Sequence, residues 1–182
     1  HHLSSYNDFF NKQIFNIFKE KNPIRILKKP ITLTKNNLPD FKFKSNLYLG
    51  GKNGDKIYYG KPIIYDENNS HFMYPNEARL RNMTYGFSIH IDVDVEFFIY
   101  DDDENLINQS ITLDNVFLGR FPIMLNSDLC ILKGMSPETK FNIGECKNDH
   151  GAYFIIDGKE KSIVCQEKFA DNMLYIRDKY NE

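Results

Sequence analysis

The side chains best spaced for chemistry are three carboxylates, Asp92, Asp94 and Glu96, which alternate with apolar residues. A period of two places all three on one face of a strand, with neighbours about 7 Å apart. Hard cations need converging oxygen ligands, and no glycine-punctuated calcium loop accompanies these residues. We therefore interpret the acidic run 92–104 as an exposed hairpin that ends in a turn at 101–104, and we predict no metal site.

Thiols and imidazoles are the next candidates for nucleophilic or metal chemistry. Cys130, Cys146 and Cys165 contain no C-x-x-C pair, which argues against a structural zinc site. Cys165 and His150 suggest a thiol nucleophile with its base, but Cys165 lies in an apolar stretch where a buried thiol is normally inert. No catalytic residues are predicted. The odd number of cysteines favours free thiols in a reducing compartment.

The glycine-rich stretch Gly50–Gly54 contains a lysine and therefore invites comparison with a phosphate-binding loop. The spacing G-x-x-x-x-G-K-[ST] is absent, and the pattern of strand, loop and helix does not follow. A turn between two strands is the prediction for this segment.

The elements that must position these residues begin with one helix. Ser4 or Ser5 can cap it, and it should end before Pro23, because the residue preceding proline is disfavoured in helical geometry. Its apolar residues recur at spacings of three and four, namely Phe9, Phe10, Ile14, Ile17 and Phe18.

Strands dominate the rest of the chain. Alternation predicts strands over 41–44, 56–59 and 87–95, and apolar runs predict strands at 111–113 and 116–125, the last with a bulge or edge at Gly119 and Pro122. Asp157-Gly158 between two apolar runs is a strong hairpin signal. Pro75 and Pro137 each open a short helix or turn, and residues 166–182 are predicted to be helical. The fold class is therefore α+β, an amino-terminal helix followed by a mostly antiparallel mixed sheet with short helices.

Composition bounds the class of protein. With 182 residues and 41% hydrophobic side chains, the chain is large enough for one domain with a core. No window approaches 18 apolar residues and the start lacks a secretory signal, so we expect neither a membrane span nor secretion. Residues 1–3 are interpreted as a possible tag remnant and residues 4–182 as a single domain.

Charge is distributed unevenly along the chain. Residues 1–70 carry 12 Lys or Arg and 6 Asp or Glu, whereas residues 71–182 carry 11 and 19. A basic arm on an acidic body can steer a protein toward polyanions, although a solvated surface explains the same distribution.

Three segments resemble one family. The segment Tyr74-Pro75-Asn76-Glu77-Ala78-Arg79-Leu80-Arg81-Asn82-Met83-Thr84-Tyr85 is similar to the Y-P-x-E-A-R-L-R-N-x-T-Y segment of the second-largest subunit of multisubunit DNA-directed RNA polymerases of eukaryotic type. The stretch 117–125, FLGRFPIML, and the hairpin 151–161, GAYFIIDGKEK, followed by Cys165-Gln166-Glu167, resemble the same family in the same order. The resemblance spans roughly residues 4–176.

The resemblance implies that the chain is the first portion of the protrusion, an α+β domain on one wall of the DNA cleft, in a much longer subunit. The family's chemistry is nucleotidyl transfer by two metal ions held elsewhere, so the fragment itself should be non-catalytic and without a cofactor. Magnesium and zinc are expected elsewhere in the full polymerase. The residues carried over as candidates for facing nucleic acid or the cleft are Arg79, Arg81, Lys161, Gln166 and Lys168. For the two arginines, an internal ion pair with Glu77 or the acidic strand remains the alternative.

The implied partners are the largest polymerase subunit, other polymerase subunits, the DNA template, the RNA transcript and initiation factors, with no membrane. The implied location is the nucleus or, for a viral protein, host cytoplasm and virion. Asn and Ile each occur 20 times and Lys 18 times against 5 Arg, which suggests an A/T-rich genome and fits a large DNA virus. The second hypothesis is a free-standing, non-catalytic accessory or decoy protein that shares this domain.

Overall fold

The computed structural model describes residues 1–28, 43–67, 69–100 and 106–176. The helical elements are α1 (His2–Asp8), a π-helical stretch η1 (Phe9–Gln13), α2 (Ile14–Lys21), α3 (Pro75–Leu80) and α4 (Pro137–Asn142). The strands are β1 (Ile24–Lys28), β2 (Phe43–Leu49), β3 (Ile57–Tyr59), β4 (Ile63–Tyr65), β5 (Ser70–Phe72), β6 (Gly86–Tyr100), β7 (Leu106–Pro122), β8 (Phe154–Ile156) and β9 (Lys159–Lys161). The α+β prediction is confirmed.

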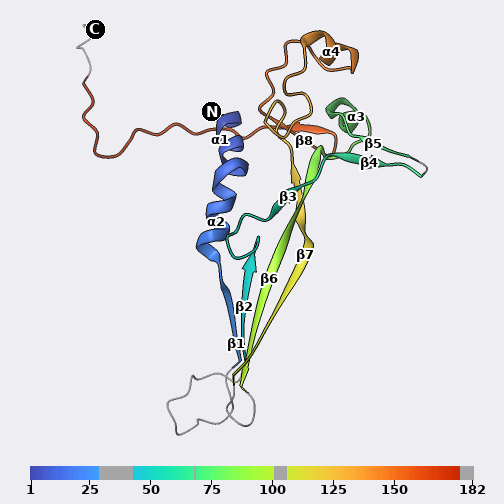
Figure 1. Cartoon of the computed structure of the whole chain (residues 1–182). Coiled ribbons are helices and arrows are strands. Elements are labelled where there is room, and N and C mark those ends of the chain that lie inside the picture. The colour runs from blue at the N-terminus through green and yellow to red at the C-terminus, as the bar shows by residue number, and fades with distance from the viewer. Residues whose placement is uncertain (29–42, 68, 101–105, 177–182) are drawn as a thin grey trace.

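The long strand β6 organises the main sheet. Along one edge it pairs with β7, and along the other it pairs with β2 and β3, all antiparallel. β1 extends the sheet beyond β2. Two small antiparallel pairs, β4 with β5 and β8 with β9, stand apart from this sheet. Figure 1 shows both near the end of β6 where α3 and α4 also lie.

The core forms where the amino-terminal helices lie along β6 (Figure 1). Phe10 of η1 meets Phe87 with ring centroids 5.4 Å apart, and Ile14 and Phe18 join the same buried cluster. On β6 the buried apolar residues follow the predicted period of two, namely Phe87, Ile89, Ile91, Val93 and Val95. The alternation placed this face correctly because one side of the sheet carries the helices.

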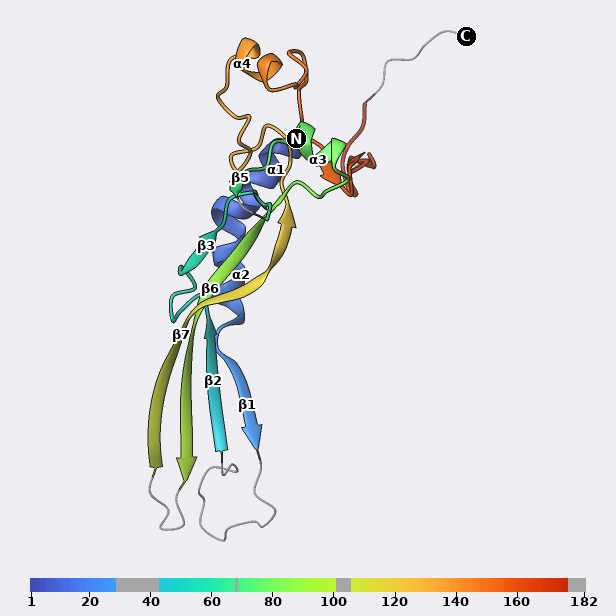
Figure 2. The same ribbon diagram turned by 90° about the vertical axis from the view of Figure 1, so that its right-hand side faces the viewer.

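The sheet continues past the helices as β1, β2, β6 and β7 side by side, as Figure 2 shows. Register places Ile26 of β1, Val95 of β6 and Ile111 of β7 on the same face as the core. Ile26 and Ile111 are half exposed, at 51% and 50%, whereas Val95 is at 8%. The core face therefore extends beyond the helices as an apolar surface, which we call the distal sheet face (Ile24, Ile26, Ile99, Ile107, Ile111 and Leu113).

Several sequence expectations are refined. Neither Ser4 nor Ser5 caps the first helix, which begins at His2 without a side-chain cap. The predicted helix at 166–182 is wrong over its described part, because residues 166–176 are exposed and non-helical. Charged composition favoured a helix there, but no apolar face packs to stabilise one. The 101–104 turn and residues 41 and 42 lie outside the described residues.

The bulge predicted near Gly119 is confirmed, and a second irregularity in the pairing of β6 with β7 lies nearer the start of β7. Register shifts occur between Ile89 and His90 and between Ile91 and Val93 on β6. β7 is also an edge strand, as expected. The Asp157-Gly158 hairpin is confirmed, with positive φ of 50° and 73° at its two turn residues. In the part of the chain described, no helix combines the length and apolarity needed to cross a membrane.

Candidate functional site

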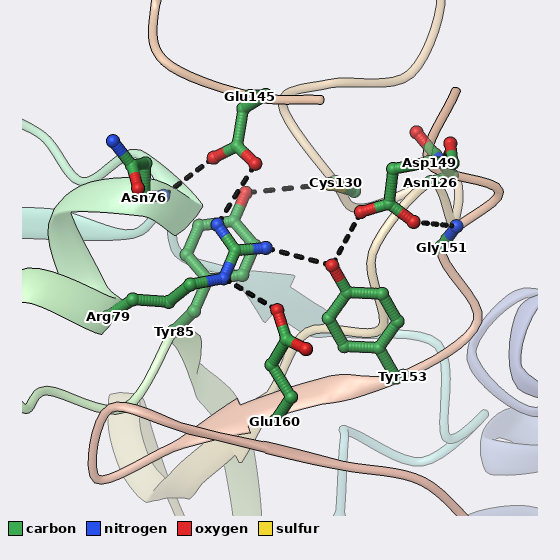
Figure 3. A network of polar contacts seen from close by, with 10 residues as sticks. All are labelled: Asn76, Arg79, Tyr85, Asn126, Cys130, Glu145, Asp149, Gly151, Tyr153 and Glu160. Atoms are coloured by element: carbon green, nitrogen blue, oxygen red, sulfur yellow. Dashed lines mark hydrogen bonds and ion pairs between the residues drawn. The ribbon is translucent and has the colours of Figure 1, made fainter. Parts of the chain in front are cut away.

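The candidate site centres on Arg79 in the short helix α3. Pro75 occupies the first turn of this helix, where a missing backbone N–H costs nothing, and Pro75 and Ala78 are buried. Arg79 directly follows the buried Ala78, and its side chain is 21% exposed. Figure 3 shows its guanidinium among side chains that come from three separate segments.

The guanidinium of Arg79 donates to three partners. Nη1 donates to Glu145 Oε2 at 3.0 Å, Nε to Glu160 Oε1 at 2.9 Å and Nη2 to the Tyr153 hydroxyl at 2.8 Å (Figure 3). The Glu145 side chain is 3% exposed and that of Glu160 is 56% exposed. The contact with Glu145 is therefore the buried ion pair, and the contact with Glu160 is a solvent-exposed addition to it.

Glu145 is held from two sides. Its other carboxylate oxygen, Oε1, accepts the backbone N–H of Asn76 at 2.6 Å, in the first turn of α3. Burial alone would lower the pKa of the Arg79 guanidinium, but the hydrogen bond and negative charge of Glu145 outweigh it and raise that pKa above its ordinary value. Arg79 therefore stays charged near neutral pH and does not act there as an acid or a base.

The network continues through Tyr153 into the loop before β8. The Tyr153 hydroxyl donates to Asp149 Oδ2 at 2.5 Å, and Asp149 Oδ1 accepts the backbone N–H of Gly151 at 2.8 Å (Figure 3). Burial, together with the Asp149 carboxylate, raises the pKa of Tyr153 above its ordinary value. This phenol stays protonated near neutral pH and serves as a structural hydrogen-bond donor.

Tyr85, which directly precedes β6, contacts the chain that follows β7. Its hydroxyl donates to Cys130 Sγ at 3.7 Å and accepts the backbone N–H of Ile131 at 3.2 Å. Burial raises the pKa of Tyr85 well above its ordinary value. Cys130 is the buried cysteine of the three, and its environment is that of a structural thiol rather than a reactive one.

Arg81 lies on a different side of α3. Its guanidinium contacts Glu77 Oε1 at 3.2 Å and Asp66 Oδ1 at 3.2 Å, so it joins α3 to the turn between β4 and β5. The side chain is 45% exposed. Of the internal partners anticipated from the sequence, Glu77 pairs with Arg81, whereas Arg79 uses Glu145 and Glu160.

Of the three remaining candidates, Lys161 belongs to the β8–β9 hairpin, and Gln166 and Lys168 follow it. Lys161 is the last residue of β9 and is exposed, and Gln166 lies exposed in the extended segment beyond it. Lys168 contacts Asp171 at 3.5 Å with both side chains largely exposed. No hydrogen bond or ion pair joins any two of the five candidates within the described ranges. Glu160, next to Lys161, joins the β8–β9 hairpin to Arg79.

The acidic residues of β6 are each engaged by a different partner. Asp92 accepts the backbone N–H of Asn115 at 3.0 Å and the Tyr58 hydroxyl at 3.0 Å. Asp94 accepts from Thr112, and Glu96 pairs with Lys52 at 2.6 Å. Asp92 is buried at 7%, so the expectation of a wholly exposed acidic face is wrong at this position. Asn115 has φ of 55°, and its N–H to Asp92 stabilises the bulge there.

Cys165 is exposed and lies beyond β9, so the expectation that it is a buried strand thiol is wrong. The apolar run 162–165 suggested a strand, but β9 ends at Lys161. Its Sγ lies 3.6 Å from His2 Nε2, not beside His150. Cys146 is also exposed. Across the described ranges, no group of three or more His, Cys, Asp or Glu residues is placed to hold a metal ion.

Taken together, the site is a clamp. It ties α3, the loop that carries Glu145 and Asp149, and the β8–β9 hairpin through one guanidinium and one phenol. Sequence reasoning found Arg79 but missed Glu145, Tyr153 and Asp149. Glu145 and Tyr153 lie 66 and 74 residues from Arg79 in the sequence, and Asp149 contacts Tyr153 rather than Arg79. No local spacing in the sequence therefore indicates these partners.

Comparison with known proteins places this architecture in a family. Residues 1–177 match the model of a family described as RNA polymerase beta subunit. The chain is 36% identical over 133 residues to the DNA-directed RNA polymerase II subunit RPB2 of Schizosaccharomyces pombe. The aligned region covers 68% of this chain and 11% of that protein. It is 31% identical over 188 residues to the corresponding subunit of Eremothecium gossypii, covering 96% of this chain and 14% of that protein.

An archaeal relative gives the same result. The chain is 32% identical over 177 residues to the DNA-directed RNA polymerase subunit Rpo2N of Methanothermobacter thermautotrophicus, covering 97% of this chain and 29% of that subunit. The chain thus spans between about a tenth and three tenths of the length of these relatives. It belongs to the RNA polymerase beta subunit family and corresponds to the amino-terminal region of the second-largest polymerase subunit.

Proposed function

We propose that this chain is the protrusion-like portion of a second-largest polymerase subunit and contributes to the wall of the DNA cleft during transcription. The observation that carries the proposal is the family match over residues 1–177, since it covers almost every element of the fold. The full complex would be a DNA-directed RNA polymerase, a nucleotidyltransferase. The portion formed by this chain would have no catalytic role.

The clamp supports a positioning role. A buried Arg79–Glu145 pair and the Tyr153–Asp149 bond hold α3 and the β8–β9 hairpin in one arrangement. Surfaces that line a nucleic-acid path need this rigidity, because misplacement of a contact weakens it. We assign contacts with nucleic acid to three exposed residues at the end of the β8–β9 hairpin and beyond it, namely Lys161, Gln166 and Lys168.

The partners in this proposal are the largest subunit, the other polymerase subunits, DNA template, RNA transcript and initiation factors. Magnesium for nucleotidyl transfer and zinc would be bound elsewhere in the complex. For a eukaryotic source the location would be the nucleus. The relatives named above come from cellular organisms, so the viral origin stays a prediction from composition.

A test of the assignment starts from the source cells. An antibody raised against this chain should capture a much longer polypeptide together with further polymerase subunits, identified by mass spectrometry. The captured material should synthesise RNA on a DNA template. A polypeptide of about this chain's length that brings no polymerase subunits would instead establish the accessory or decoy role.

A second experiment tests the contact with nucleic acid. In the assembled polymerase, we expect the triple change Lys161→Ala, Gln166→Ala and Lys168→Ala to make the complex release DNA at lower salt. Released counterions drive such binding, and removing two cations should reduce the slope of log K against log salt by about 2. Lys19→Ala on α2, also an exposed lysine, is the control. An unchanged slope in the triple variant would exclude these residues from the nucleic-acid path.

A further inference from the structure

A cavity that the clamp does not use lies at the end of the main sheet, where β6 begins and β7 ends. It has a volume of about 500 Å³ and lies between the β4 strand and the adjoining ends of β6 and β7. Ser88 of β6 and Arg120 of β7 are register partners, so they share one face of the sheet, while Phe87 next to Ser88 faces the helices. The apolar residues lining the cavity include Ile63, Met73 and Met83.

The chain before β4 is held close to this cavity by Gly60. Its backbone N–H donates to the Ser88 carbonyl oxygen at 2.8 Å. A Cβ at Gly60 would lie 2.3 Å from Ser88 Oγ, so a larger residue would fit there only if the Ser88 side chain rotated away. The consequence is that Lys61, the next residue, stands at the cavity wall together with Arg120.

The cavity is positively charged in a chain whose net charge is -2. Lys61 and Arg120 both line it, and none of its lining residues is acidic. The Arg120 side chain is exposed and makes no hydrogen bond or ion pair with any described residue. Lys61 Nζ lies 5.5 Å from the centroid of the Phe72 ring, a contact that leaves its charge uncompensated. Neither cation pairs with a carboxylate of the described residues, so both are available to an anionic ligand.

A second cavity of about 330 Å³ also includes Lys61 in its wall. Its remaining lining is dominated by apolar groups, among them Phe72, Leu129 and Ile131. Lys61 therefore borders two hollows, one with a second cation and one almost wholly apolar. A ligand that fills both must offer negative charge and apolar bulk within a short distance.

We propose that these two cavities form a binding site for an extended acidic peptide segment of a protein partner, in which carboxylates alternate with large apolar side chains. The carboxylates would bind Lys61 and Arg120, and an apolar side chain would enter the hollow beside Phe72. Charge complementarity and the apolar lining together favour this occupant. The phosphates of a nucleic acid would also meet the two cations, but its bases bind by stacking on aromatic faces, and Phe72 alone among the residues lining the second cavity is aromatic.

The test uses the full chain and a fluorescein-labelled octapeptide of alternating aspartate and leucine, with binding followed by fluorescence anisotropy. Two matched peptides, one with asparagine for aspartate and one with serine for leucine, separate the two requirements. We expect each matched peptide to bind at least about tenfold more weakly than the aspartate–leucine peptide. Loss of a charge-assisted hydrogen bond, or of a buried leucine side chain, changes a dissociation constant by a factor of this order.

Variants locate the site. Arg120→Gln and Lys61→Gln should each weaken the aspartate–leucine peptide by about tenfold. Arg25→Gln on β1 and Lys159→Gln on β9, which remove the same charges elsewhere, should leave binding unchanged. Both cavity cations are exposed, so thermal unfolding of their variants should match that of the parent chain. Equal binding by the asparagine peptide, or equal losses in the control variants, would overturn the proposal.

A single-stranded DNA dodecamer is the competing probe. If it binds more tightly than the peptide and loses affinity in Arg120→Gln and Lys61→Gln but not in the controls, the site belongs to nucleic-acid phosphate and the peptide proposal is wrong. Because the peptide site needs no polymerase subunit in the assay, its failure leaves the proposed transcription role untouched.

Discussion

Replacement of Arg79 by alanine tests whether the clamp is what holds the carboxy-terminal half of the fold together. The change removes a guanidinium that pairs with Glu145, whose side chain is 3% exposed, and with Glu160, whose side chain is 56% exposed. Loss of one partner leaves Glu145 as a buried charge. Breaking a buried pair in this way costs about 3–5 kcal/mol, whereas an exposed ion pair contributes about 0–1 kcal/mol.

Two features place Arg79→Ala at the lower end of that range. Glu145 keeps the backbone N–H of Asn76 at 2.6 Å, and Arg79 itself is 21% exposed, so water can reach the vacated position. The expected loss is therefore about 3 kcal/mol of unfolding free energy. For a domain of this size, 1 kcal/mol corresponds to roughly 2–4 °C, so the midpoint of thermal unfolding should fall by about 6–12 °C.

The assay is thermal unfolding followed by far-ultraviolet circular dichroism, with Arg81→Ala as the matched control. Arg81 is the residue that follows the same helix, and its side chain is 45% exposed in its ion pairs with Asp66 and Glu77, so we expect its loss to cost about 0–1 kcal/mol. A double-mutant cycle with Glu145→Gln should give a coupling free energy of about 1–2 kcal/mol, since residues in one network are not additive.

Equal midpoints for Arg79→Ala and Arg81→Ala would refute this account of the clamp. If, in addition, Arg79→Ala flattened the dependence of nucleic-acid binding on salt, Arg79 would be a phosphate contact rather than an internal tether. A loss of several degrees with an unchanged salt slope would exclude the nucleic-acid role for this arginine.

Three further outcomes are expected. Gly151→Ala should lower the unfolding free energy by more than about 2 kcal/mol, measured by urea denaturation, because φ is 71° there and a Cβ would lie 2.4 Å from the Leu125 carbonyl oxygen. The Asn115 N–H lowers the pKa of Asp92, so the stabilisation by the Asp92 carboxylate is complete above the ordinary aspartate pKa and is lost as pH falls through the lowered folded-state value. Stability should therefore decline less steeply on acidification in Asp92→Asn than in the parent chain. An identical decline in the two proteins would exclude this stabilising role of Asp92. The distal sheet face should cause self-association that Ile111→Lys reduces in sedimentation velocity, and a strictly monomeric parent chain that binds no hydrophobic dye would contradict this.

Much of the fold is determined by local sequence. The alternation through Phe87 to Val95 specified a strand with one buried face, and the apolar residues of 9–18 specified the helix that packs on it. Asp157-Gly158 specified its hairpin, because few residue pairs adopt positive φ at both turn positions. These signals depend on neighbours within a few residues, which is why one sequence suffices to read them. The family resemblance, carried by three longer segments, was equally visible without a structure.

The tertiary structure decided which of those residues meet. Arg79 was visible as a candidate, but its partner Glu145 is 66 residues away and lies in a loop without a motif. Lys61 and Arg120 are also far apart in the sequence, yet both line one cavity. The backbone hydrogen bond from Gly60 and the register of β6 with β7 bring them there. A charged side chain whose sequence neighbours are polar becomes buried, or joins other charged side chains, only when distant segments pack together. Whether an arginine faces nucleic acid or a buried carboxylate depends on that long-range packing, which residue spacing does not encode.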